Sequence, residues 1–289
     1  MEANQTAVAL SKLNVLKQNK IHLERLVFFV PGWTDESCAW WQEPHDSNQS
    51  IKQWLSQVAD NPELAQYVDF TQETKQCKSF LDFGEVLRNK VWAAIGKDQP
   101  FDLVGHSMGG LDIRAAITQG SDPLLKCNFC VTVATPNWGD NLGGVESFLM
   151  THFSKEAEAI KPMEPYHLEQ GKNLDPDYQP IKTVNSLDNR RLLLSRVNKF
   201  YELKGTQDLV VQGSAFMDMT GIKDLYKEKV VSYAVDGCEH TGIKGITLDP
   251  RTVLAVVNIL CNIEIKLGFN YGDLSGGVYT PPDDKDVFI

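Results

Sequence analysis

The sequence contains no long apolar run: nowhere do about 20 consecutive apolar residues, the length that spans a bilayer, occur together. Residues 1–19 lack a basic start followed by an apolar core, so we expect no signal peptide. Positive charge is scarce, since 28 Lys and Arg stand against 38 Asp and Glu and the net charge is −10. These features argue against a membrane-spanning protein, a nucleic-acid partner and electrostatic binding to anionic membranes. We therefore expect a cytoplasmic or otherwise soluble protein.

Cysteine is also sparse, with six residues in a chain of 289. Cys127 and Cys130 have the C-x-x-C spacing, but neither a second such pair nor a pair of histidines accompanies them. A zinc site is therefore not predicted, and we expect neither a metal nor a cofactor. Cys130 is expected to pack as a small apolar residue in a buried strand, which favours a reducing compartment.

Repeats and low-complexity tracts are absent, and 42% hydrophobic with 23% charged residues is ordinary for a globular protein. A chain of this length suits one large α/β domain. Strands that alternate with helices predict a doubly wound, mostly parallel sheet covered by helices on both faces. The apolar runs that predict strands are residues 25–32, 101–104, 129–135, 196–203 and 230–235. The helical patterns are residues 79–96, 111–117 and 250–268.

These elements occupy residues 25–268, which we predict to be the folded domain. Residues 1–24 are predicted to be an N-terminal extension, and residues 269–289, with several Gly and Pro, a C-terminal tail. Between residues 138 and 180 the pattern loosens into a polar stretch rich in Pro, Glu and Asp. This segment is a candidate lid or cap insertion.

The most informative stretch is residues 101–110, Phe-Asp-Leu-Val-Gly-His-Ser-Met-Gly-Gly. It reads as an apolar strand, a tight turn with one serine and a helix that starts on two glycines, which is the context that a G-x-S-x-G nucleophile elbow requires. Such a turn lifts the hydroxyl of Ser107 clear of the sheet, while Gly105 and Gly109 remove side chains where strand and helix would collide. Ser107 is the predicted nucleophile. The alternative is a glycine-rich turn that contains serine by chance.

A serine nucleophile needs a base, and the base needs an orienting partner. Among six histidines, His240 follows the last predicted strand, in a loop with glycines on both sides. Because the carboxyl ends of parallel strands share one edge of a sheet, we expect His240 to lie near Ser107. His106 adjoins Ser107, but the turn sends neighbouring side chains in different directions.

The predicted acid is Asp208, which lies in a turn after the strand at 196–203 and between the serine and the histidine in chain order. Asp140, which follows the strand at 129–135, is the rival acid. Two backbone N–H groups are expected to bind the oxyanion: that of Met108, directly after the nucleophile, and that of Trp33, in the loop after the first strand.

These motifs resemble those of the α/β-hydrolase superfamily, and within it the lipase and esterase branch. The likeness lies in residues 30–33 (Val-Pro-Gly-Trp), 105–110 (Gly-His-Ser-Met-Gly-Gly) and 134–139 (Ala-Thr-Pro-Asn-Trp-Gly), and around Asp208 and His240. Members commonly carry His-Gly where this sequence has Pro-Gly at 31–32. The resemblance implies an α/β-hydrolase fold and the hydrolysis of carboxylic esters through an acyl-enzyme on Ser107.

The expected partner is an ester with an apolar acyl chain, with a transient lipid interface as a further candidate partner. Apolar residues at helical spacing in 145–153 suit a lid face or an acyl pocket, and equally a buried helix. The candidate substrate-binding residues are Trp40, Trp41, Trp138, Phe148 and Leu149. The same triad would serve an acyltransferase, a thioesterase or another protein or lipid deacylase. A non-catalytic binding member of the fold is the remaining alternative.

Overall fold

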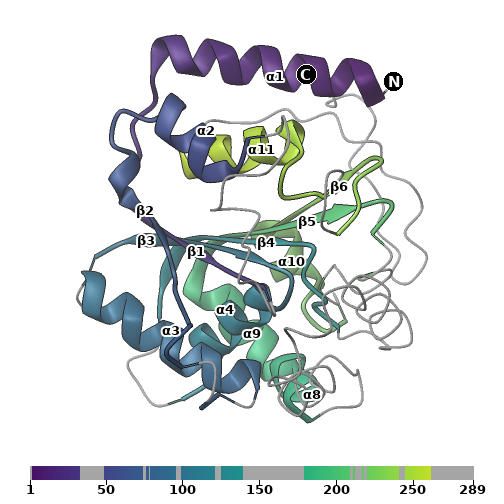
Figure 1. Cartoon of the computed structure of the whole chain (residues 1–289). Coiled ribbons are helices and arrows are strands. Elements are labelled where there is room, and N and C mark those ends of the chain that lie inside the picture. The colour runs from purple at the N-terminus through teal and green to yellow at the C-terminus, as the bar shows by residue number, and fades with distance from the viewer. Residues whose placement is uncertain are drawn as a thin grey trace, which may run out of the picture.

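One parallel sheet organises the part of the chain that the computed structural model describes: residues 2–32, 49–73, 76–77, 79–95, 99–120, 125–138, 179–208, 211, 217, 220–240 and 245–261. Within these residues the sheet has six strands in the order β2-β1-β3-β4-β5-β6 (Figure 1). They are β1 (Leu26–Val30), β2 (Ala65–Tyr67), β3 (Phe101–His106), β4 (Cys127–Val133), β5 (Val197–Gly205) and β6 (Val230–Val235). The winding direction reverses between β1 and β3. In such sheets ligands bind at the carboxyl ends of the strands beside this point.

The central strands are buried on both faces, which explains their continuous apolar sequences. Every residue of β3 is buried, and in β4 only Asn128 is partly exposed. Val104 of β3 lies opposite Phe29 of β1 on one side and opposite Val131 of β4 on the other. The strands that the sequence predicts are therefore confirmed, with ends that differ by a few residues.

Helices cover both faces of the sheet (Figure 1). On one face lie α2 (Ile51–Val58) and α11 (Pro250–Leu260), and α1 (Glu2–Asn19) packs across them. The other face carries α3 (Phe80–Ile95), α4 (Met108–Thr118), α8 (Gln179–Val184), α9 (Leu187–Arg196) and α10 (Lys223–Lys229). Two hydrophobic cores result, one beneath each helical layer. The doubly wound α/β architecture is confirmed.

The apolar pattern does not predict α1, α2, α8, α9, α10 or the short β2, which follows a 3-10 turn, η1 (Pro62–Leu64). A local signal for α2 is present, because Ser50 and Gln53 form a capping box in which each side chain accepts from the other's backbone N–H. α1 belongs to the segment predicted as an extension, and it buries Leu13 in the first core. The helix predicted over 250–268 is seen to Leu260, and residues 262–289 lie outside the described part.

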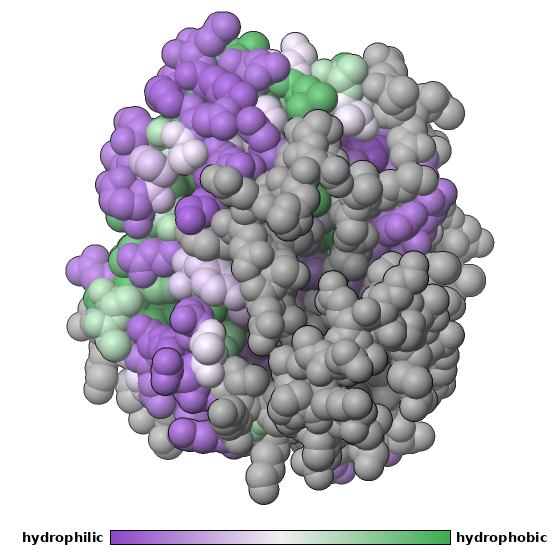
Figure 2. All heavy atoms as spheres, viewed as in Figure 1, coloured by the Kyte–Doolittle hydropathy of each residue, from purple (hydrophilic) through white to green (hydrophobic). Residues whose placement is uncertain are grey.

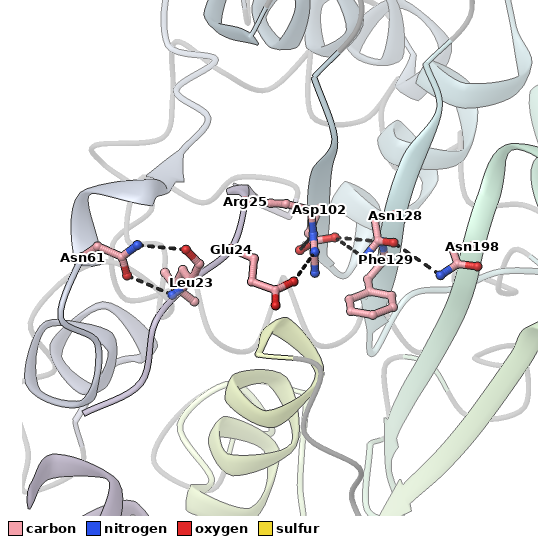
Figure 3. A network of polar contacts seen from close by, with 8 residues as sticks. All are labelled: Leu23, Glu24, Arg25, Asn61, Asp102, Asn128, Phe129 and Asn198. Carbon is pink, nitrogen blue, oxygen red and sulfur yellow. Dashed lines mark hydrogen bonds and ion pairs between the residues drawn. The ribbon is translucent and has the colours of Figure 1, made fainter. Parts of the chain in front are cut away.

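A polar network joins the amino ends of the central strands, at the sheet edge opposite the carboxyl ends (Figure 3). Asp102, at the start of β3, accepts from Nε of Arg25 at 3.1 Å and from the backbone N–H of Phe129 at 2.8 Å. Asn128 donates to Asp102 at 3.3 Å and accepts from Asn198 of β5 at the same distance. Burial raises the pKa of Asp102, and the charge of Arg25 opposes this shift. The network links the starts of β3, β4 and β5 with the segment before β1.

No helix among the described residues is both long and apolar enough to cross a membrane. Hydrophilic residues gather over α1 in the view of Figure 2. The exposed apolar side chains of this helix, Leu10 and Val15, are single ones of the kind that any protein surface carries.

Candidate active site

The turn between β3 and α4 has the backbone geometry of a nucleophile elbow. Ser107 has φ 53° and ψ −128°, a left-handed conformation that is costly for a residue with a side chain. Its backbone N–H donates to the carbonyl of Val133 at 2.9 Å, which ties the turn to β4. Gly109 is required next to it, because a Cβ there would lie 2.2 Å from the carbonyl oxygen of Pro31. The glycine lets the start of α4 approach the loop that follows β1.

The structure brings Ser107, Asp208 and His240 together at the carboxyl edge of the sheet. Nε2 of His240 lies 2.9 Å from Oγ of Ser107, and Nδ1 lies 2.8 Å from Oδ2 of Asp208. His240 is 7% exposed and Asp208 4% exposed, so this contact is shielded from water. Because a carboxylate can only accept, Nδ1 of His240 carries the proton and Nε2 is left to accept from the serine hydroxyl.

The loops that carry Asp208 and His240 are joined to each other. Thr206, after β5, donates its N–H to the carbonyl of Val235 at 3.1 Å, and its hydroxyl accepts from the N–H of Gly237 at 2.9 Å. Gln207 donates its N–H to the carbonyl of Cys238 at 3.0 Å. These bonds fix the spacing of the two loops before the side chains of the acid and the histidine meet.

Arg251, in the first turn of α11, holds the histidine loop from the other side. Its guanidinium pairs with Asp249 through two contacts, at 2.8 and 2.9 Å. Nη2 also donates to the carbonyl of Asp236 at 2.7 Å and to Sγ of Cys238 at 3.6 Å. Gly205 completes the arrangement, because a Cβ there would lie 2.3 Å from the carbonyl oxygen of Cys238. The loop therefore has little room to move relative to β5.

Three features of the structure define its fold. The parallel sheet is wound in both directions, a serine occupies a strained strand-to-helix turn at its carboxyl edge, and an acid and a histidine follow in that chain order. The chain has the α/β-hydrolase fold. Neither a protein-family model nor a curated protein matches the sequence.

Solved structures of the α/β-hydrolase fold are similar over most of the chain. A Mycobacterium tuberculosis protein named as the non-heme bromoperoxidase BpoC has a TM-score of 0.48 at 11% identity, covering 83% of this chain and 93% of that one. Esterase RhEst1 from a Rhodococcus species has 0.44 at 16%, covering 84% and 91%. Human thioesterase 2 also has 0.44 at 16%, covering 83% and 94%.

Of the two predicted oxyanion donors, Met108 and Trp33, the structure describes only Met108. Met108 is the first residue of α4, so its N–H belongs to the helix N-terminus, where backbone donors and the helix dipole favour negative charge. Trp33 lies outside the described residues. The residue before it, Gly32, is close to Ser107, because a Cβ there would lie 2.9 Å from Cβ of Ser107. The segment that leads to Trp33 therefore adjoins the elbow.

Of the predicted substrate-binding residues, the structure describes only Trp138. It lies in the turn after β4, is 37% exposed, and its ring centre is 6.0 Å from the guanidinium of Arg190. The residues that lie outside the described part are Trp40, Trp41, Phe148, Leu149 and the rival acid, Asp140.

No group of three or more His, Cys, Asp and Glu among the described residues could hold a metal ion.

Cys127 and Cys130 are both buried in β4 and both have free thiols. The burial predicted for Cys130 is confirmed. Its hydrogen bond with Cys130, together with burial, holds the pKa of the Cys127 thiol well above its usual range.

Arg114 of α4 is fully buried and joins the two segments that border residues 139–178. Nη1 donates to the carbonyl of Asn137 at 2.7 Å, while Nη2 donates to the carbonyl of Val184 and to Oδ1 of Asn185, both at 2.9 Å. Burial lowers the pKa of Arg114 to about 10, so the side chain stays charged at neutral pH. Sequence reasoning misses this anchor, although a charged residue within the apolar pattern of residues 111–117 is a signal for it.

We expect Arg114→Met to lower the free energy of unfolding by about 3 kcal/mol, because it leaves buried carbonyl and amide oxygens without their donor. Urea titration followed by circular dichroism measures the change. The matched control is Arg191→Met, since Arg191 is exposed and donates one bond, at 3.2 Å, to the carbonyl of Gly221. The control should stay within about 0.5 kcal/mol of the wild type. Equal stability of both variants would contradict the role of Arg114 as an anchor.

Proposed function

We propose that this protein is a serine hydrolase that cleaves carboxylic esters through an acyl-enzyme. One observation carries the proposal: Oγ of Ser107 lies 2.9 Å from Nε2 of His240, whose Nδ1 lies 2.8 Å from Asp208. At these distances the imidazole can take the hydroxyl proton as the oxygen attacks, and the buried carboxylate can stabilise the imidazolium that forms. A serine hydroxyl without such a base is a poor nucleophile.

In the acylation half-reaction, Oγ of Ser107 forms a bond to the carbonyl carbon of the ester while Nε2 of His240 takes the proton. The carbonyl oxygen gains the negative charge, and the N–H groups of Met108 and Trp33 are its proposed donors. When the carbon–oxygen bond to the alcohol breaks, His240 returns the proton to the leaving oxygen. The alcohol departs and the acyl group remains on Ser107.

Deacylation repeats these steps with water. His240 takes a proton from the water molecule as its oxygen attacks the acyl carbon, and the same donors hold the oxyanion. Collapse of the intermediate breaks the bond to Oγ, and the proton on His240 passes to Ser107. The products are a carboxylic acid and the free enzyme, so no cofactor takes part in the proposed cycle.

The proposed substrate carries an apolar acyl chain. Support comes from Trp138, a large side chain that is 37% exposed in a turn at the carboxyl edge of β4. The other candidate residues for binding the acyl chain are Trp40, Trp41, Phe148 and Leu149. We also propose a transient lipid interface. We further propose that residues 138–180 form a lid.

A fluorophosphonate probe should label the protein once, and peptide mass spectrometry should locate the label on Ser107. p-Nitrophenyl esters from acetate to palmitate should be hydrolysed, with kcat/KM rising along the series because each buried methylene adds about 0.8 kcal/mol. A rate increase above the concentration at which the long esters form micelles would support the lipid interface.

Two controls separate this reaction from its alternatives. Product analysis with a competing alcohol distinguishes hydrolysis from acyl transfer, and an acyl-thioester series identifies a thioesterase. A protein that neither takes the label nor turns over any ester or thioester would exclude the proposed activity and leave a non-catalytic binding member of the fold.

A further inference from the structure

The ring of His106 occupies the space between the nucleophile and the histidine loop. His106 is the last residue of β3 and is 3% exposed. Its ring centroid lies 5.0 Å from that of His240, with the ring planes at 38°. On the other side, a Cβ added to Gly32 would lie 3.5 Å from Nδ1 of His106. The side chain is therefore enclosed between the loop after β1 and the proposed general base.

We propose that His106 is a positioning residue for His240, and that its ring packs against this imidazole and keeps it aligned between Ser107 and Asp208. The inference rests on the proposed function, because it concerns the alignment of the general base. Hydrogen bonds hold Nδ1 and Nε2 of His240 in place. The plane of the ring can still tilt about the line that joins these two nitrogens. The orientation of a histidine ring is only broadly restricted by its own torsion. A flat, buried group against one face of the ring removes this freedom.

The charge of His106 is consistent with this role. Burial and the neighbouring His240 lower the pKa of His106 to about 3, while the charge of Asp208 and a hydrogen bond with the backbone of His240 act in the opposite direction. His106 is therefore neutral at neutral pH. When His240 takes up the serine proton, no second imidazolium opposes it at 5.0 Å. A lysine or arginine at this position would fill the space but repel the transition state.

The test compares His106→Phe, which keeps a flat ring, with His106→Gln, which keeps polarity without a ring. We expect His106→Phe to retain kcat within about threefold, since the proposed role belongs to the ring face. His106→Gln should lower kcat about 10²-fold with little change in KM, because a small misplacement of a reacting group has an effect of this size. His106→Leu, an apolar side chain without an aromatic face, replaces the glutamine variant if that variant does not fold.

A spectroscopic readout separates positioning from a general loss of structure. The Nδ1 proton of His240, while hydrogen-bonded to Asp208, is expected at low field in the ¹H NMR spectrum of the protonated imidazole. The signal should persist in His106→Phe and broaden or disappear in His106→Gln, while the thermal midpoints show that both are folded. The acid limb of the kcat/KM profile should keep its midpoint in His106→Phe, since a neutral ring replaces a neutral ring.

Three results would overturn the inference. The first is wild-type kcat with an intact low-field signal in His106→Gln. The second is an equal loss of kcat in both variants with the signal retained. The third is a shift of about one pH unit in the midpoint of the acid limb of the kcat/KM profile of His106→Phe. Failure of the proposed function looks different. In that case the wild type takes no fluorophosphonate label, while the low-field signal still depends on residue 106.

Discussion

Ser107→Ala is expected to lower kcat for ester hydrolysis by about 10⁴- to 10⁶-fold and to abolish fluorophosphonate labelling. The substitution removes only the hydroxyl that lies 2.9 Å from Nε2 of His240. Backbone strain stays the same, because alanine must adopt the same positive φ of 53°. The thermal midpoint and KM should therefore change little. This separation of activity from stability is what identifies a nucleophile.

A double variant sharpens the prediction. His240→Ala alone should reduce kcat nearly as much as Ser107→Ala, and the two together should cost no more than either one. Groups that act as one unit are strongly non-additive, because the hydroxyl is unreactive without its base. Ser195→Ala is the matched control, since this exposed serine of α9 donates only to the carbonyl of Leu192. Additive losses, or retained labelling in Ser107→Ala, would move the nucleophile to another residue.

The elbow could be predicted because its information is local. Residues 101–110 contain the strand, the turn and the helix start, and each of the glycines has a steric reason that the sequence alone suggests. The proximity of Asp208 and His240 follows from a more general rule, that parallel strands bring their carboxyl ends to one edge. A preceding strand selects His240 among the histidines, but Asp140 also follows a strand, so the choice of Asp208 rests in addition on the chain order serine, acid, histidine.

What the sequence does not reveal depends on partners far along the chain. Arg114 binds Val184 and Asn185, 70 and 71 residues away, and no spacing rule connects these positions. His106 is different, because it adjoins Ser107 in sequence and yet its ring lies against His240. Local reasoning predicts that its side chain points away from Ser107 but cannot identify the residue that this side chain contacts. α1 is missed for a third reason, since its apolar residues form no clear stripe.

Asp208→Asn should lower kcat about 10⁴-fold, although its shape is nearly unchanged. Oδ1 of Asp208 accepts from the backbone N–H of Val211 at 2.8 Å, so the amide oxygen of asparagine is expected to keep that place. The amide NH₂ then faces Nδ1 of His240, which must become the acceptor. The proton moves to Nε2 and points at Ser107, so the hydroxyl has no base. The loss should appear in kcat, while KM stays nearly constant.

Asp236→Asn provides the matched control. The carboxylate of Asp236 lies on the neighbouring loop and accepts from the hydroxyl of Thr206 at 3.0 Å, whereas the carboxylate of Asp208 contacts the ring of His240. An amide oxygen can accept that bond equally well, so activity should change less than threefold. Asp140→Asn tests the rival acid in the same assay. If Asp208→Asn keeps a tenth or more of wild-type kcat while Asp140→Asn loses nearly all of it, the carboxylate that orients the base is the other one. We expect the opposite order, because the carboxylate at Nδ1 decides which nitrogen of His240 carries the proton.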